Sequence, residues 1–351
     1  MVAAGEVSAA APLPWLEAPL QLALRTQRGH AILVHGPAGV GQFELALELA
    51  RSWLCEAPRG PANVACGTCP SCRLVQARSH PDLLVLVPDA LRVALGWSDS
   101  DADAGATVDK ASKAKPSKDI RIDALRAAIQ FAQSTSARGR AKVVVIHPAD
   151  RMNEFAANSL LKTLEEPPGK ARFVLATGHP HALLPTVRSR CQSLPLGVPE
   201  PHAALRWLEA QGVARAAVLL AAHGGQPLQA LDAARQGIDA TLWSALPASL
   251  LRGDASAYSA WPLPGLIDAL QKLCHDALCV ACGAAPRYFE PAVLPPRAAL
   301  GALTAWGQSL RELTRRAEHP WNAGLMLETL VQQAQRALRP VRQAVGYTSP
   351  P

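Results

Sequence analysis

The chain has 351 residues, of which 49% are hydrophobic and 18% are charged, and 35 basic against 28 acidic side chains give a net charge of +7. At roughly 150 residues per domain this length predicts two to three domains, and the composition excludes wholesale disorder. No stretch approaches about 18 uninterrupted apolar residues, so the sequence predicts no membrane span. The positive charge permits contact with nucleic acid without establishing it.

The start of the chain and its cysteines indicate the compartment. The first basic residue is Arg25, and Glu6 and Glu17 precede it, so we expect no secretory signal and a cytoplasmic protein. Eight cysteines are too few for a disulfide scaffold in a chain of this length. In a reducing compartment their spacing is interpreted first as metal binding.

Residues 1–197 alternate between short, continuous apolar runs and helical patterns. Five runs are predicted strands: 31–34, 83–87, 143–146, 173–176 and 192–196. Continuous apolar runs are typical of strands covered by helices on both faces. Predicted helices lie between them: 43–54, 125–132 and 157–164. This alternation predicts a parallel α/β sheet.

Other segments depart from that rhythm. Residues 89–119 are rich in Ala, Asp, Ser and Lys and are predicted as a flexible insertion at the sheet edge, with 110–118 as a solvated basic loop. From about residue 199 the strand patterns end. We expect helical domains at 198–240 and 241–351, a proline-rich hinge around 286–296 and a frayed end at 346–351.

The first predicted strand leads into a glycine-rich turn, GPAGVGQF. Gly36, Gly39 and Gly41 have the backbone freedom with which a phosphate-binding loop turns successive N–H groups onto an anion. The chemistry also requires a lysine for the phosphates and a hydroxyl for magnesium, but those positions hold Gln42 and Phe43. Two alternatives stay open: the glycines serve only the packing of the turn, or the loop backbone binds a nucleotide weakly.

A second element of such a site is a strand that ends in two carboxylates, one for magnesium and one to activate water. Here the strand reads KVVVIHPAD, so His147 and Pro148 occupy the acidic positions and Asp150 follows two residues later. The lysine, the hydroxyl and the acidic pair are all missing. We therefore expect neither ATP nor Mg²⁺ in this site, and no ATP hydrolysis.

Two longer segments, KVVVIHPADRMNEFAANSLLKTLEEPP and FVLATGHPHALLPTVRSRC, closely resemble the bacterial DNA polymerase III clamp-loader family of AAA+ ATPases and their inactive relatives. Its most specific motifs are NSLLKTLEEPP at 158–168 and the SRC triplet at 189–191. Near the end, HPWNAGLMLETL is similar to the family's Asn-Leu-Glu helix, with matches at Asn322, Leu325 and Glu328. The resemblance implies an AAA+ α/β domain at 1–197, then a small helical lid domain and a helical collar domain that joins an oligomer.

Within that family, a degraded phosphate loop beside an intact triplet looks like the delta-prime subunits. The tau/gamma ATPase subunits would keep the lysine and the acidic pair, and a delta subunit would lack the triplet. The resemblance thus implies a stator that does not cleave ATP. Its partners would be the tau/gamma and delta subunits, and within the complex the sliding clamp and primed DNA.

The resemblance also implies a role for the triplet. Arg190 would be an arginine finger that projects into the ATP site of a neighbouring subunit, while Ser189 and Cys191 shape and pack the turn. A guanidinium is always charged and forks onto phosphate oxygens, which suits this role. From the residues alone, an ion pair between Arg190 and a carboxylate at a strand edge stays open.

Four cysteines follow the spacing C-x10-C-x2-C-x2-C: Cys55, Cys66, Cys69 and Cys72. Four thiolates make a closed tetrahedral zinc site with no position for water, so the Zn²⁺ would be structural. Clamp-loader subunits carry a zinc module at this place, here about residues 52–75. An iron–sulfur cluster is the rival, although the nearby Cys-Pro of ferredoxin-type runs is missing, and free thiols are a third alternative.

The remaining candidates are weaker. The helical region holds a second group of possible ligands: Cys274, His275, Cys279 and Cys282. We interpret the cysteines mostly as small buried apolar residues, and a second metal site stays open as an alternative. His35 and His80 are interpreted as turn or core residues. His179 and His181 lie near Thr177, where the family has a nucleotide-sensing residue.

Two other classes of function compete with the stator. The first is an active clamp-loader-type ATPase with an atypical loop, which residues 42, 43, 147 and 148 oppose. The second is a zinc-containing nucleic-acid-binding protein. The charge is compatible with it, but the sequence lacks the alternation of basic and aromatic residues that would form a stacking platform.

Overall fold

The computed structural model describes residues 12–339 except positions 28, 98–115, 255, 296–297 and 317–320. The chain divides into two compact units, residues 1–203 and 204–351. The first boundary lies near the predicted one at 197, whereas the further division at 240 into lid and collar stays a prediction. Among the described helices none is both long and apolar enough to cross a membrane.

The first unit is built on a five-stranded sheet in the order β2-β3-β4-β1-β5, with every pairing parallel. Its strands occupy all five expected places: β1 (Ala31–His35), β2 (Leu83–Leu86), β3 (Lys142–Ile146), β4 (Ala171–Thr177) and β5 (Gln192–Pro195). The register sets Leu33 beside Leu175 on one side and Ser193 on the other. The parallel α/β sheet is therefore confirmed.

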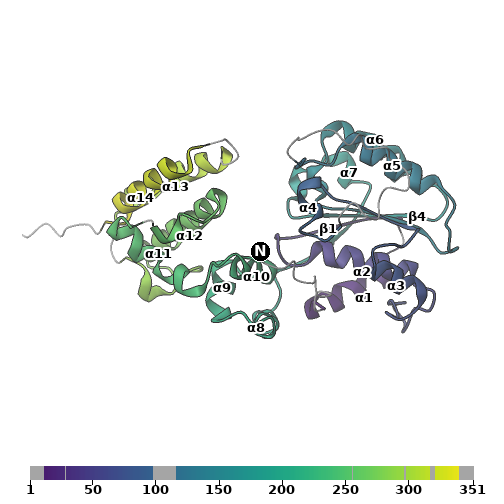
Figure 1. Ribbon diagram of the computed structural model, residues 1–351, viewed down its shortest axis with the longest axis horizontal. Coiled ribbons are helices and arrows are strands. Elements are labelled where there is room, and N and C mark those ends of the chain that lie inside the picture. Colours follow the sequence, from purple (N-terminus) through teal and green to yellow (C-terminus); the bar gives the residue numbers. More distant parts are fainter. Residues whose placement is uncertain are drawn as a thin grey trace, which may run out of the picture. The chain divides into compact units, whose positions relative to one another are not determined.

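Helices cover both faces of this sheet (Figure 1). One face carries α1 (Glu17–Thr26), α2 (Gln42–Leu54) and α3 (Pro70–Gln76), and the other carries α5 (Ile122–Gln133), α6 (Glu154–Glu165) and α7 (Pro185–Arg188). Strand β3 is buried along its whole length. This double cover explains why the strands read as continuous apolar runs.

The segment predicted as an insertion begins where expected, directly after the edge strand β2. Its first residues form a single helical turn, α4 (Asp89–Arg92). Residues 98–115, with most of the basic part 110–118, lie outside the described residues, as do residues 346–351.

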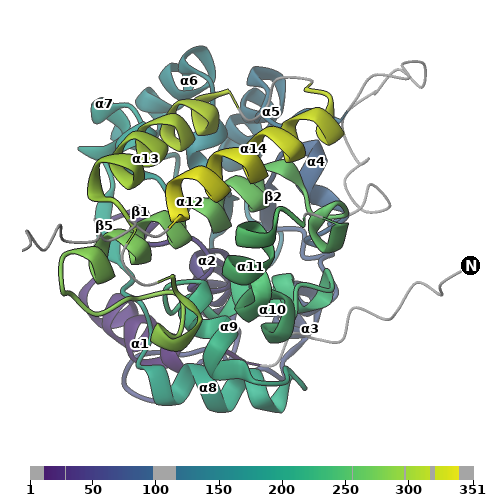
Figure 2. The same ribbon diagram turned by 90° about the vertical axis from the view of Figure 1, so that its left-hand side faces the viewer.

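The described part of the second unit is helical, as predicted. Its helices are α8 (Pro201–Ala210, which begins in the first unit), α9 (Ala216–Ala222), α10 (Pro227–Arg235), α11 (Ala240–Arg252), α12 (Leu263–Ala281), α13 (Leu300–Arg315) and α14 (Ala323–Leu338). Helix α14 contacts α11, α12 and α13, and Figure 2 shows α13 and α14 side by side. The Asn322 carboxamide caps α14 by accepting the N–H of Leu325 at 3.2 Å.

Candidate functional site

The glycine-rich turn after β1 is packed closely by its own chain. A Cβ atom on Gly36 would lie 2.1 Å from the carbonyl oxygen of Leu196. Gly41 has a φ of +105°, and a Cβ there would approach Leu13 to 2.8 Å. The indole of Trp15 donates to the carbonyl of Val40 at 2.8 Å. The segment before α1 therefore lies against the loop, and packing requires at least two of its glycines.

Gln42, at the lysine position, is turned back onto the loop. Its side chain is buried, and its Nε2 donates to the carbonyls of Gly36 at 2.8 Å and Pro37 at 2.6 Å. These bonds satisfy the amide with the loop's own oxygens. A neutral amide in this position brings no charge to offset that of a phosphate.

Phe43 and His147, far apart in the sequence, stack on each other with ring centroids 4.8 Å apart. The sequence pattern predicts these two positions as those that would hold the magnesium hydroxyl and a magnesium carboxylate, and the structure brings the two side chains together. Burial lowers the pKa of His147 to about 4, and the imidazole is neutral at pH 7. These two neutral rings therefore offer no anionic oxygen to a metal ion.

Asp150 lies near this stack, but its carboxylate has other partners. It accepts a hydrogen bond from the Thr177 hydroxyl at the end of β4, and its other oxygen is 3.7 Å from Nδ1 of His179. Thr177 in turn accepts the backbone N–H of His179 at 2.9 Å. The residues around Thr177 therefore stabilise a turn at the end of β4.

His35 and His80 lie where the sequence interpretation places them. His80 is buried in the turn before β2, and its Nδ1 accepts the N–H of Asp82 at 3.0 Å. His35 ends β1, where its ring is 2.7 Å from the Ser193 hydroxyl. Burial, with Arg188 and His181 nearby, lowers the pKa of His35.

Arg190 follows α7 and is paired within its own chain. Its Nε donates to Glu165 at 2.6 Å, its Nη2 contacts the same carboxylate, and its Nη1 donates to the carbonyl of Thr186 at 2.9 Å. The two side chains are 30% and 49% exposed, so the pair lies at the surface. An ion pair of Arg190 is therefore present, but its carboxylate lies at the end of α6 and not at a strand edge. The partner was hidden because Glu165 lies 25 positions away along the chain.

The rest of the triplet forms the turn itself. The Ser189 hydroxyl donates to the carbonyl of Thr186 at 3.1 Å. Burial raises the pKa of Cys191 to about 12, so at pH 7 this thiol is protonated and unreactive. These contacts fit residues that shape the turn beside Arg190.

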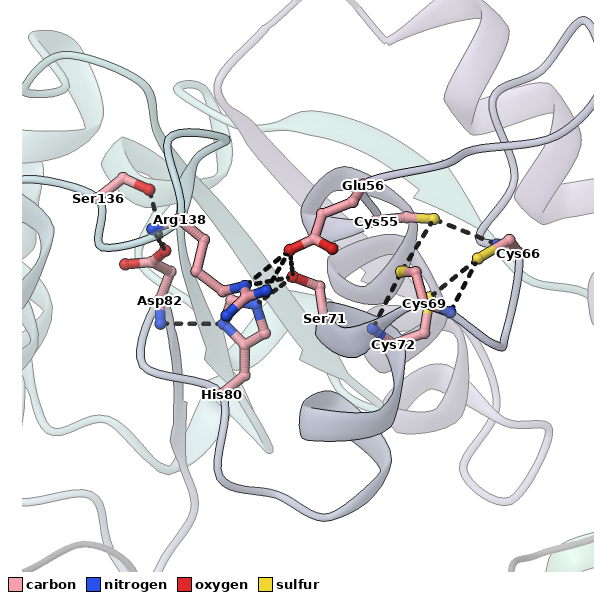
Figure 3. Close-up of polar contacts among 10 residues, drawn as sticks. All are labelled: Cys55, Glu56, Cys66, Cys69, Ser71, Cys72, His80, Asp82, Ser136 and Arg138. Carbon is pink, nitrogen blue, oxygen red and sulfur yellow. Dashed lines mark hydrogen bonds and ion pairs between the residues drawn. The ribbon is translucent and has the colours of Figure 1, made fainter.

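The four spaced cysteines converge on one point between the end of α2 and the start of α3 (Figure 3). Their sulfurs all lie within 4.8 Å of one another, with Cys55 and Cys69 3.8 Å apart and Cys66 and Cys72 4.0 Å apart. Four sulfurs about 2.3 Å from a tetrahedral zinc ion would be about 3.8 Å from each other, so the donor set fits. Backbone N–H groups of Thr68 and Cys69 lower the pKa of Cys66 to about 6, whereas burial raises the pKa of Cys72 to about 12. The cluster could hold a metal ion and is compatible with zinc.

A polar network fastens this module to the sheet domain (Figure 3). The Arg138 guanidinium donates to Glu56, next to Cys55, from Nε at 2.8 Å and from Nη2 at 2.5 Å, and also reaches Ser71 at 2.9 Å. The buried Asp82 carboxylate accepts the backbone N–H groups of Ala137 and Arg138 at 2.7 and 2.9 Å. Sequence reasoning missed this network, because its partners are far apart along the chain and no local pattern marks them.

The second cysteine group is only partly as predicted. Cys274 is buried, but Cys279 is half-buried and Cys282 is exposed, because α12 ends at that point. Donor atoms of His275, Asp276 and Cys279 lie within 4.8 Å of one another. Three backbone N–H groups already occupy the Asp276 carboxylate at 2.7 to 2.9 Å: those of Arg287, Tyr288 and Phe289. Asp276 therefore anchors the proline-rich segment to α12.

Comparisons with known proteins give relatives that are named as subunits of DNA polymerase III. Residues 18–200 match the family described as "DNA polymerase III, delta subunit". The chain is 37% identical over 230 residues to a Pseudomonas aeruginosa protein named DNA polymerase III subunit delta', a match that covers 64% of this chain and 62% of that protein. It is 32% identical over 281 residues to the Escherichia coli protein of the same name, covering 74% of this chain and 76% of the relative.

Among solved structures, the chain is similar to a Thermotoga maritima protein described as DNA polymerase III gamma subunit-related. The TM-score is 0.47 at 19% identity, and the match covers 93% of this chain and all of the other.

Proposed function

The chain belongs to the family of DNA polymerase III delta-prime subunits, and on this premise we propose that it is the stator of a cytoplasmic clamp loader. In this role it takes part in DNA replication without hydrolysing ATP. It assembles with tau/gamma ATPase subunits and a delta subunit, and the complex places a sliding clamp on primed DNA. The helical segment 241–351 serves as the collar through which it joins the others.

The stack of Phe43 on His147 is the observation that carries this proposal. Magnesium-dependent phosphoryl transfer needs a cation, a hydroxyl and carboxylates around the phosphates. The corresponding positions hold an amide bound to its own loop and two stacked neutral rings. The expected consequence is that the isolated chain shows no magnesium-dependent turnover of ATP, and measurable turnover would favour the ATPase alternative.

Arg190 is the group that acts on a neighbour. Its guanidinium is at the surface, permanently charged and held in a forked orientation by Glu165 and Thr186. We infer that it leaves this carboxylate for the phosphates of a nucleotide bound to the adjacent ATPase subunit, where it stabilises the charge of the transition state. An exposed ion pair contributes only about 0–1 kcal/mol, so exchanging the partner costs little.

The four cysteines hold a structural zinc ion in this proposal. Zinc would fix the ends of α2 and α3 together, and a site closed by four sulfurs leaves no position for a substrate. The module therefore serves the fold and takes no part in ATP chemistry.

The test is Arg190→Ala in a loader reconstituted with its other subunits. Arginine fingers contribute roughly 10³- to 10⁵-fold to turnover, so hydrolysis at the site that receives Arg190 should fall by about 10³-fold or more. Assembly, followed by size-exclusion chromatography, should not change. The control is Arg188→Ala, since Arg188 is exposed on the same turn but outside the triplet. Wild-type ATPase and clamp-loading rates in the Arg190 variant would contradict the finger.

A further inference from the structure

A cleft of about 750 Å³ lies on the first unit, at the edge of the sheet where the parallel strands begin. It is lined by residues that precede or open β1, β3 and β4, among them His30, Arg140 and Arg172. The glycine-rich turn follows the opposite end of β1. The cleft is therefore separate from the degraded phosphate loop, and its volume is in the range of ligand sites.

The lining of this cleft is positively charged. Among the described residues that line it are Arg140, Lys170 and Arg172, and none of them is an aspartate or a glutamate. None of the ion pairs between described residues involves these three cations. Uncompensated cations in a concave site attract anions, because the walls focus their field.

Arg172 is the most firmly placed of the three cations. It is half-buried on β4, and its guanidinium lies 4.8 Å from the ring centroid of Trp53, which also lines the cleft. Burial lowers its pKa, but an arginine stays charged at pH 7. Stacking on the indole orients the guanidinium while leaving its donors free for a ligand.

The cysteine module forms one wall. Pro58, Ala62 and Asn63 come from the module, whereas Gly139 and Arg140 come from the loop before β3. The bonds of Arg138 to Glu56 and Ser71 join these two segments directly beside the cleft. The cleft is thus a built feature that depends on a folded module.

We propose that this cleft binds a chain of phosphate groups, as in the backbone of a single-stranded nucleic acid or in a free polyphosphate. The cations come from separate segments, namely the loop before β3, the residue before β4 and β4 itself, and a row of cations suits successive phosphates along a chain. Arginine and lysine side chains with no carboxylate partner are the groups that bind phosphate oxygens. The inference is independent of the role of Arg190.

The experiment uses the full, metal-loaded chain and two probes in separate titrations. One probe is a short fluorescent single-stranded oligonucleotide followed by anisotropy, and the other is inorganic tripolyphosphate followed by calorimetry. The test variants are the exposed pair Arg140→Gln/Lys170→Gln and the triple variant with Arg172→Gln. The control is Arg206→Gln/Arg235→Gln/Arg315→Gln, which removes three exposed arginines of the second unit. Thermal unfolding checks that every variant is folded.

The triple variant should bind the oligonucleotide at least about tenfold more weakly. The slope of log K for binding against log salt concentration should become less negative by about 2, because each lost phosphate contact removes roughly 0.7. The double variant Arg140→Gln/Lys170→Gln should show a smaller loss of affinity, and the control variant should bind like the wild type. Binding of the oligonucleotide alone identifies a nucleic-acid strand as the ligand, and equal binding of tripolyphosphate identifies a free polyphosphate. Equal losses in the control and the cleft variants, or no binding of either probe, would overturn the proposal.

Discussion

Two places in the first unit carry the sequence pattern of an ion site, and they differ in what remains of it. At the glycine-rich turn, Gln42, Phe43 and His147 lie at the positions where the pattern of a phosphate site requires a cation and metal-binding groups. These three side chains are buried or half-buried against one another and the loop. At the cysteine module all four donors remain, and their sulfurs converge at distances that fit a metal.

The difference follows from what surrounds each place. The loop is next to the sheet and α2, where residues such as Leu45, Leu49 and Val144 are completely buried, so packing alone can hold it. The cluster around the four cysteines contains little else that is apolar apart from Ala65. A segment without a core of its own needs a metal to hold it, whereas a loop inside a large core does not.

Metal removal tests this comparison with the largest expected effect. Cys72→Ser, or a strong chelator, should release one equivalent of zinc and lower the free energy of unfolding by more than about 5 kcal/mol, since isolated zinc modules gain about 10–16 kcal/mol from the ion. Metal analysis and urea unfolding measure both. The control Cys282→Ser alters an exposed cysteine outside the cluster and should change neither. Iron with visible absorbance in the purified protein would exclude zinc as the occupant.

Phe43→Ala tests the second part of the comparison, namely that packing against the core holds the glycine-rich loop. Removing a buried aromatic ring should lower the free energy of unfolding by about 3–5 kcal/mol, measured by urea unfolding. Phe155→Ala is the matched control, because that ring is 78% exposed and its loss should change the value by no more than about 0.5 kcal/mol. Equal effects of the two variants would show that the ring at position 43 is not part of the core.

The pH dependence of the free energy of unfolding tests the burial of His147, and its expected effect is smaller. His147 has a pKa of about 4 when folded and 6.5 when unfolded, so as the pH falls the unfolded chain takes up the proton first. Its stabilising contribution is complete above pH 6.5 and is lost between pH 6.5 and about 4, at about 1.4 kcal/mol per pH unit. Burial also lowers the pKa of His223 to about 4, so two histidines should contribute to the loss of stability at acid pH.

Urea unfolding at pH 7 and pH 5 measures this loss. His147→Phe keeps a ring against Phe43 and should remove the part of this pH-dependent loss that His147 causes. His223→Phe should remove the part that His223 causes. An unchanged pH dependence in His147→Phe would mean that this imidazole is not held neutral by burial.

The sequence by itself determined the elements and the ligand sets that follow local rules. The five strands read as continuous apolar runs because helices cover both faces, and α6 ends at Glu165, just before Pro167 and Pro168. The four cysteines were identifiable because their donors lie close together along the chain. The altered loop residues could be named because each position in such a loop has a fixed chemical role.

Only the tertiary structure decided which distant groups meet. The stack of Phe43 on His147, the pair of Arg190 with Glu165 and the junction of Arg138 with Glu56 each join segments with no shared local pattern. The basic cleft was hidden for the same reason, since Arg140 precedes β3, Arg172 is on β4, and the parallel sheet brings the starts of these two strands to one edge. Periodicity reports which side of an element is buried, whereas the register and the connections of the sheet determine what it is buried against.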